Sequence, residues 1–189
     1  MPATEPIRDK KVLRQLADYW LKLGNLRNYT LIVLGACTAL RPNDLLQLTW
    51  DDVYDNDHGI FRSHITVTEK KTGKKKTIAL NKQAKKALQL YFPYRRGEFI
   101  FMSNRKDGKA ISRVQAWRVI RKAAEAIAAA CKVALYSLRK TTGYHAWKAG
   151  ASPVVLMDIY NHSNYATTRR YLGVNQDDQD EIYMGLALF

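Results

Sequence analysis

Apolar residues follow a helical spacing over most of this chain and a strand spacing in one short stretch. Apolar side chains three or four positions apart predict amphipathic helices, which Asp9, Asn81 and Ser112 begin as capping residues. Ser112 and Gln115 together form a capping box. The helices are expected over residues 9–24, 26–40, 81–91, 112–130 and 137–150, and in the segment that begins at Ser152 and Pro153.

The strand spacing brackets a lysine-rich turn. Ile65 and Val67 alternate with threonines, and Ile78 and Leu80 repeat that alternation after the turn, which predicts a β-hairpin. A shorter strand is expected at residues 99–101. These patterns predict one α+β domain over residues 1–189 that is mainly helical, with a small antiparallel sheet, an N-terminal helix within residues 1–24 and a C-terminal helix or tail at residues 174–189.

The charge of the chain favours a polyanionic partner. Its 31 basic and 17 acidic residues leave a formal net charge of +14, which is typical of nucleic-acid-binding proteins. Ribosomal, heparin-binding and anionic-membrane-binding proteins can be equally basic, so charge alone leaves these classes open. The chain has no apolar run of about 18 residues and no secretory signal at its start, so an intracellular, cytoplasmic protein is expected.

Neither cysteine has a partner at the spacing of a metal site. Cys37 lies in an apolar run, and Cys131 follows an alanine-rich segment. Both are interpreted as reduced packing residues, and no metal site is expected.

Four residues of three types suited to attack on a phosphodiester stand out in this sequence. Arg139, His162 and Tyr171 lie within 33 residues, and Arg41 lies far upstream beside Asp44. Guanidinium groups bind phosphate oxygens in pairs of hydrogen bonds, histidine can donate another, and tyrosine can act as a covalent nucleophile. The ordinary alternatives are a surface ion pair for Arg41 and Asp44, a surface histidine, and a packed aromatic ring.

Four stretches of the chain, in this order, resemble the catalytic domain of the tyrosine recombinase (lambda integrase) family. The resemblance covers residues 25–173, nearly the whole chain, and its stretches are GACTALRPNDLLQLTWDDV, KKTGKKKTIAL, YSLRKTTGYHAWKAG and IYNHSNYATTRRYLGV.

The resemblance implies a role for each candidate residue. Arg41 and Arg139 would stabilise the transition state, with Asp44 supporting Arg41. Lys71 would protonate the leaving 5′ oxygen, and His162 would donate to the phosphate. Tyr171 would form a 3′-phosphotyrosyl link to DNA. Neither ATP nor a metal is implied, so no cofactor is expected.

The chain departs from the family pattern at several points. Tyr136 stands where the family's HxxR motif usually has histidine, and a phenol is a poor base at neutral pH. Asn161 stands where glycine commonly precedes the late histidine, and few residues precede the matched region, where many members carry a core-binding domain. A catalytically weakened or silent DNA-binding protein and a type IB-like topoisomerase therefore remain alternatives to a recombinase.

DNA contacts and assembly are also expected. Lysines make up five of the seven residues at 70–76, which suggests a phosphate-gripping hairpin tip, although a solvated tip is the alternative. The DNA-contact residues expected are Lys70, Lys74, Lys75, Arg113 and Lys140. The apolar stripe near the C-terminus could pack within the chain or on a neighbour. The family resemblance implies exchange of such a helix between protomers in a dimer or tetramer on double-stranded DNA, with accessory DNA-bending proteins as further partners.

Overall fold

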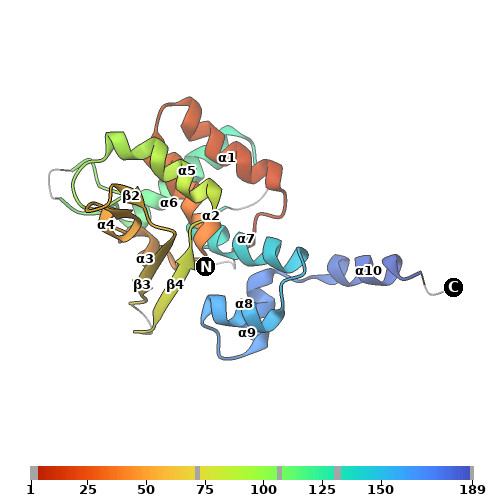
Figure 1. Ribbon diagram of the computed structural model, residues 1–189. Coiled ribbons are helices and arrows are strands. Elements are labelled where there is room, and N and C mark those ends of the chain that lie inside the picture. The colour runs from red at the N-terminus through yellow and green to blue at the C-terminus, as the bar shows by residue number, and fades with distance from the viewer. Residues whose placement is uncertain (1–3, 71–72, 106–107, 130–132, 188–189) are drawn as a thin grey trace.

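The computed structural model describes residues 4–70, 73–105, 108–129 and 133–187 of the chain. It is mainly helical, as the apolar spacing predicts (Figure 1). The helices are α1 Lys10–Lys22, α2 Leu26–Thr38, α3 Pro42–Leu46, α4 Trp50–Val53, α5 Lys82–Tyr91, η1 Phe92–Tyr94, α6 Arg113–Ala126, α7 Leu135–Lys148, α8 Pro153–Tyr160, α9 Tyr165–Leu172 and α10 Gln176–Gly185.

Two antiparallel strand pairs accompany the helices. The predicted hairpin is confirmed: β3 His64–Thr68 pairs with β4 Lys75–Ala79, and Ile65 lies opposite Ile78. A second pair, β1 Tyr54–Asp55 with β2 Ile60–Phe61, was not expected, because two-residue strands carry too little alternation to be recognised. The strand expected at residues 99–101 is reduced to an isolated bridge between Thr49 and Phe99.

Side-chain caps explain most of the helix starts. Asn81 accepts a hydrogen bond from Ala84, and Ser112 forms its predicted capping box with Gln115. The helix expected over residues 137–150 differs at its start. Helix α7 begins earlier, at Leu135, and the Ser137 hydroxyl accepts the backbone N–H of Ala134 from inside the first turn.

Three further helix ends differ from expectation. Helix α2 ends at Thr38, where Ala39 takes a left-handed conformation at φ 52°. Helix α6 ends at Ala126 rather than near residue 130. Ser152 precedes α8 but makes no capping hydrogen bond, so Pro153 alone favours that start.

Helix α2 lies at the centre of the main core, packed against α1, α5 and α7 (Figure 1). Its Leu31 and Leu34 are fully buried. Gly35 permits the close approach of α7, because a Cβ atom there would lie 2.7 Å from a Leu138 methyl carbon. This packing fixes Arg139, the next residue of α7, beside the end of α2.

A smaller apolar cluster holds the C-terminal third of the domain. It includes Leu156, Tyr160 and Leu172, which are fully buried against α7. Helix α10 projects away from this body (Figure 1), but its first turn is anchored by ion pairs of Asp178 with Arg8 and Lys148. Among the described helices, none is both long and apolar enough to cross a membrane.

Candidate active site

Arg41 lies at the start of α3, where its guanidinium group forms an ion pair with Glu69. The Glu69 side chain is fully buried, and that of Arg41 is 15% exposed. Asp44, the carboxylate expected to support Arg41, is instead directed to the hairpin, where it accepts the backbone N–H of Lys70 at 3.3 Å. The expected Arg41–Asp44 pairing is therefore corrected to Arg41–Glu69, a contact between distant parts of the chain.

Arg139 is held in the second turn of α7 by two backbone carbonyl groups. Its Nη1 donates to Ala39 and its Nη2 donates to Tyr160 at 3.0 Å. The residue is only 1% exposed, and burial lowers the pKa of its guanidinium group. Two of its five N–H donors are used by these carbonyls, so the others remain for an anion that reaches this depth.

The last turn of α8 gathers three cationic side chains. The carbonyl oxygen of Tyr160 accepts from Arg41 at 3.5 Å as well as from Arg139, and the preceding carbonyl, of Ile159, accepts from Lys76 at 2.5 Å. Carbonyl groups at a helix C-terminus carry partial negative charge, which favours cations at that end. The end of α8 is therefore the point at which α3, β4 and α7 meet.

Tyr160 is fixed through its side chain too. Its hydroxyl donates to the carbonyl oxygen of Arg139 at 2.8 Å, and its ring packs on Gly143. Asn161, which follows, takes a left-handed conformation at φ 56°, and its side-chain amide donates to Glu69 at 2.8 Å. Glu69 thus connects Arg41 to the turn that precedes His162.

His162 and Tyr171 lie side by side at this turn. Their ring centroids are 4.6 Å apart, edge to face, and the Tyr171 ring lies 5.7 Å from the Arg139 guanidinium carbon. His162 Nδ1 shares a hydrogen bond of 2.9 Å with the Thr168 hydroxyl. Burial, and then the charges of Arg139 and Arg41, lower the pKa of His162 to about 4, so the imidazole is neutral at physiological pH.

The remaining predicted site residues are distributed around this centre. Lys71, the expected proton donor, lies outside the described residues. Tyr136 is half-buried in the first turn of α7, and exposed side chains are found at Lys70, Lys74, Lys75 and Arg113. The ammonium group of Lys140 already has a partner within the chain. It donates to the Thr4 carbonyl oxygen and lies 5.3 Å from the Tyr171 ring.

Glu69, Lys76 and the main chain of Tyr160 are functional candidates that the sequence did not reveal. Glu69 precedes a lysine-rich run and carries no motif of its own. Lys76 looks like its exposed neighbours, yet burial, followed by the positive charge of Arg139, lowers its pKa to about 8. The strand alternation that places Ile78 on the partly buried face of β4 places Lys76 on the same face, which was the available signal.

The arrangement is suited to binding a phosphodiester and attacking it. Two guanidinium groups and a neutral histidine converge beside one tyrosine, and Glu69 pairs with Arg41. Such a site can stabilise a negatively charged phosphoryl transition state.

Comparison with known structures identifies the fold. A crystal structure of XerA recombinase matches 96% of this chain and 65% of its own, at a TM-score of 0.78 and 22% identity. A lambda integrase dimer bound to a COC′ core site matches 98% of this chain and 51% of its own, at a TM-score of 0.72 and 17% identity. The chain therefore spans about half to two thirds of these chains, and it has the fold of a tyrosine recombinase catalytic domain.

Sequence comparison gives the family. The model of the phage integrase family matches residues 8–178, and the chain belongs to that family. It is 35% identical to the probable integrase/recombinase YoeC of Bacillus subtilis, with 97% of each chain covered. It is 26% identical to the tyrosine recombinase XerD of Mycobacterium leprae, covering 85% of this chain and 52% of the relative. Family membership makes the protein a DNA strand transferase of the tyrosine recombinase class.

Proposed function

We propose that this protein is a site-specific DNA recombinase whose nucleophile is Tyr171. The observation that carries this proposal is the convergence of Arg41, Arg139, His162 and Tyr171 at the end of α8. A structural match also supports the proposal: XerH site-specific recombinase bound to its difH substrate matches 98% of this chain at a TM-score of 0.77. The partner of this chain is accordingly double-stranded DNA.

The reaction follows from the positions of these groups. The Tyr171 oxygen attacks the phosphorus of a DNA phosphodiester, and the bond to the 5′ oxygen breaks as that oxygen takes a proton. A 3′-phosphotyrosyl link and a free 5′ hydroxyl result. Attack of a 5′ hydroxyl on the link reverses the step and rejoins the strands. One phosphodiester is exchanged for another, so no ATP is consumed.

Each side chain has a distinct part in this proposal. Arg41 and Arg139 bind the non-bridging oxygens, and the neutral His162 donates a further hydrogen bond. Lys71 protonates the leaving oxygen, as the family resemblance implies. Removal of one such donor at other enzymes slows the reaction by about 10²–10³-fold, and a similar loss is expected for Arg139.

The buried state of Arg139 implies that the site opens when DNA binds. The guanidinium group is 1% exposed and is covered by the Tyr160 and Tyr171 rings, which lie 4.9 Å and 5.7 Å from it. A phosphate reaches it once Tyr171 moves aside. Tyr171 sits in the last turn of α9, just before Gly173 at φ 66°, and we propose that rotation of this turn admits the phosphate.

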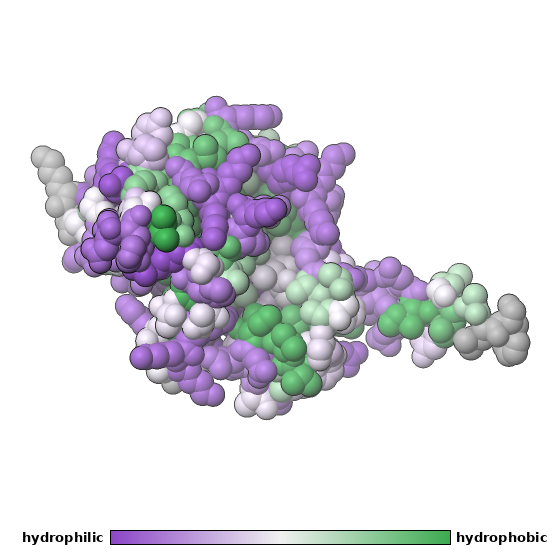
Figure 2. Space-filling model, viewed as in Figure 1, coloured by the Kyte–Doolittle hydropathy of each residue, from purple (hydrophilic) through white to green (hydrophobic). Residues whose placement is uncertain are grey.

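Helix α10 is proposed to bind a second copy of this chain on DNA. Its outer half exposes Ile182, Tyr183 and Met184, at 62%, 72% and 87%. Figure 2 shows hydrophobic surface on this projecting part of the molecule. Ion pairs of Asp178 and Glu181 hold the inner part of the helix to Arg8 and Lys148, whereas the apolar side chains beyond Glu181 are exposed. Replacement of Ile182 and Tyr183 by Asp should reduce assembly on DNA, whereas Asp180→Ala on the polar side should not. Equal assembly by all variants would exclude this interface.

A strand-exchange assay tests the main proposal. Duplexes from the chromosomal flanks of the gene are supplied as pairs with different labels, and joined products are separated from cleaved ones. Recombinant duplexes that disappear with Arg139→Lys support a recombinase. Relaxation of supercoiled plasmid without recombinants indicates a topoisomerase. DNA binding without cleavage indicates a silent accessory protein. If Tyr136→His then restores cleavage, the tyrosine at position 136 is the cause of the lost activity.

A further inference from the structure

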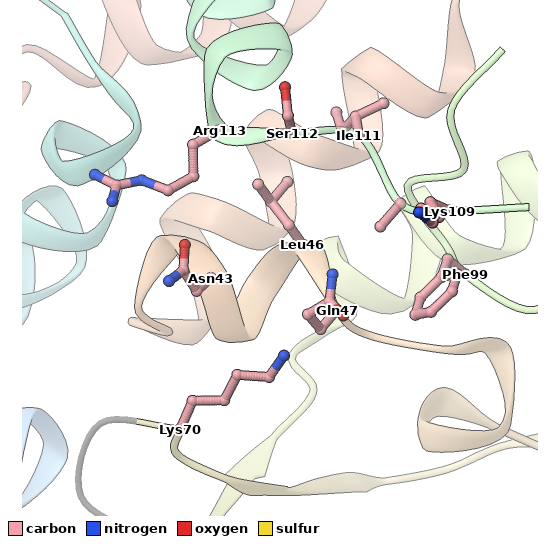
Figure 3. A pocket seen from close by; sticks show the side chains of 10 residues that line it. Asn43, Leu46, Gln47, Lys70, Phe99, Lys109, Ile111, Ser112 and Arg113 are labelled. Carbon is pink, nitrogen blue, oxygen red and sulfur yellow. The ribbon is translucent and has the colours of Figure 1, made fainter. Parts of the chain in front are cut away.

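A polar recess of about 350 Å³ lies next to the site, between α3, the hairpin and the start of α6 (Figure 3). Its floor is apolar and is formed in part by Leu46 and Ile111, each 3% exposed. Lys70 extends into it from the hairpin, toward Gln47, while Ser112 and Arg113 come from the start of α6. The side chains that line the recess make none of the catalytic contacts described above, although α3 and the hairpin also carry Arg41 and Lys76.

The charge of the recess suits nucleic acid. Lys70, Lys109 and Arg113 line it, and none of its lining residues is acidic. Phosphate groups carry only hydrogen-bond acceptors, so these cations are sufficient to bind a backbone there. When they bind phosphates, these cations provide attraction that does not depend on the base sequence.

Two carboxamide side chains add a different capacity. Asn43 and Gln47 are exposed and lie one helical turn apart, because the Gln47 backbone N–H donates to the Asn43 carbonyl oxygen. They therefore share one side of α3. A carboxamide offers a donor and an acceptor together, which matches the N6 and N7 positions of adenine in the major groove.

Helix α3 fixes the distance from these carboxamides to the reacting phosphate, since Arg41 is its N-cap residue. At about 1.5 Å of rise per residue, Asn43 lies roughly 3 Å and Gln47 roughly 9 Å along the axis from Arg41. Base pairs are spaced by about 3.4 Å along the duplex, so both side chains lie within about three base pairs of the cleaved phosphate.

We propose that Asn43 and Gln47 read base edges, with a preference for adenine, in the major groove within about three base pairs of the cleavage position. Lys70 and Arg113 hold the adjacent backbone. This inference rests on the proposed function, to which it adds a sequence preference. It makes α3 the element that joins catalysis, through Arg41, to the choice of site.

A pool of duplexes, each nicked and randomised over four base pairs on both sides of the cleavage position, tests this inference. Wild type, Asn43→Ala, Gln47→Ala and Lys70→Ala are compared with Gln89→Ala, which removes an exposed carboxamide from α5. The bound DNA and the covalently trapped DNA are sequenced separately. The bound fraction reports base reading even where no cleavage takes place, and the trapped fraction locates each base relative to the nick.

The expected result is a position-specific loss. Wild type and Gln89→Ala should enrich adenine on the order of tenfold at one or two positions, and each carboxamide variant should lose one of these preferences. Lys70→Ala should weaken binding to all sequences alike and reduce the salt dependence by about one charge. Identical base profiles for wild type and both carboxamide variants would overturn base reading, as would an equal loss at every position. Altered bound profiles with no trapped DNA would leave the inference standing and refute Tyr171 chemistry instead.

Discussion

Glu69 holds the guanidinium group of Arg41 in a buried ion pair, and the same carboxylate accepts a hydrogen bond from the Asn161 side chain at 2.8 Å. One acid therefore fixes two parts of the site, the first arginine and the turn that carries His162. An acid in this position does not contact phosphate. It orients the groups that do, and its removal should affect stability as well as rate.

Glu69→Gln should destabilise the fold by about 3 kcal/mol, because it leaves the largely buried Arg41 charge without a counterion. Urea unfolding of the whole chain measures this change. Glu125→Gln is the matched control, since it removes the exposed pair with Arg121 on α6 and should change stability by less than about 0.5 kcal/mol. Equal midpoints for the two variants would show that the Glu69 pair has no special importance.

Gly143→Ala should disturb the site from outside it. A Cβ atom there would lie 2.1 Å from the Tyr160 hydroxyl and 2.6 Å from its ring. The forced shift should cost roughly 1–3 kcal/mol, which exceeds the gain of about 1 kcal/mol from alanine in a helix. Cleavage should slow as well, since the Tyr160 carbonyl binds both arginines. Thermal unfolding measures the stability of Gly143→Ala. The control is Gly185→Ala, because no atom lies within 4 Å of a Cβ at that position. A Gly143→Ala protein more stable than wild type would contradict this packing.

Lys76 should give the reaction an alkaline limit. Its pKa is lowered to about 8 by burial and by Arg139 and Arg41, against the opposing effects of Glu69 and Asp44. The charge that holds the Ile159 carbonyl is therefore present below about pH 8 and lost above it. Lys76→Met should slow cleavage on the order of 100-fold at pH 7, as misplaced groups do.

Lys76→Arg separates charge from shape. The variant stays protonated, so it should keep activity above pH 8 where wild type loses it. Cleavage rates measured between pH 6 and 10 test whether the charge at position 76 sets the alkaline limit. Parallel profiles for wild type and Lys76→Arg would mean that another group sets the limit.

The low pKa of His162 should make the free energy of unfolding decrease as the pH is lowered. Its pKa in the folded protein, about 4, is below the ordinary value near 6.5, so the unfolded chain binds the extra proton between these values. The stability that depends on neutral His162 is complete above about pH 6.5 and declines as pH falls toward 4. His162→Asn should flatten this decline. Identical curves for wild type and His162→Asn, measured by urea unfolding, would count against a depressed pKa.

Apolar periodicity predicted the longer helices and the hairpin, because it is a local property of the chain. The family resemblance, together with residue type, pointed to the four residues that meet at the site. The sequence predicted the wrong partner for Arg41, since Asp44 is near in sequence whereas Glu69 is near only after the hairpin folds back. The roles of the Ile159 and Tyr160 carbonyl groups could not be predicted at all. A backbone carbonyl is the same in every residue, so only the fold can indicate which one is used.

Mass spectrometry of the protein–DNA adduct tests the central claim most directly. A nicked duplex that releases a short fragment after cleavage traps the covalent intermediate, which is then digested with protease and nuclease. The account predicts a nucleotide on the peptide that contains Tyr171, no adduct with Tyr171→Phe, and an unchanged adduct with Tyr165→Phe, whose exposed ring begins the same helix. An adduct on another residue, or one that persists in Tyr171→Phe, would contradict it.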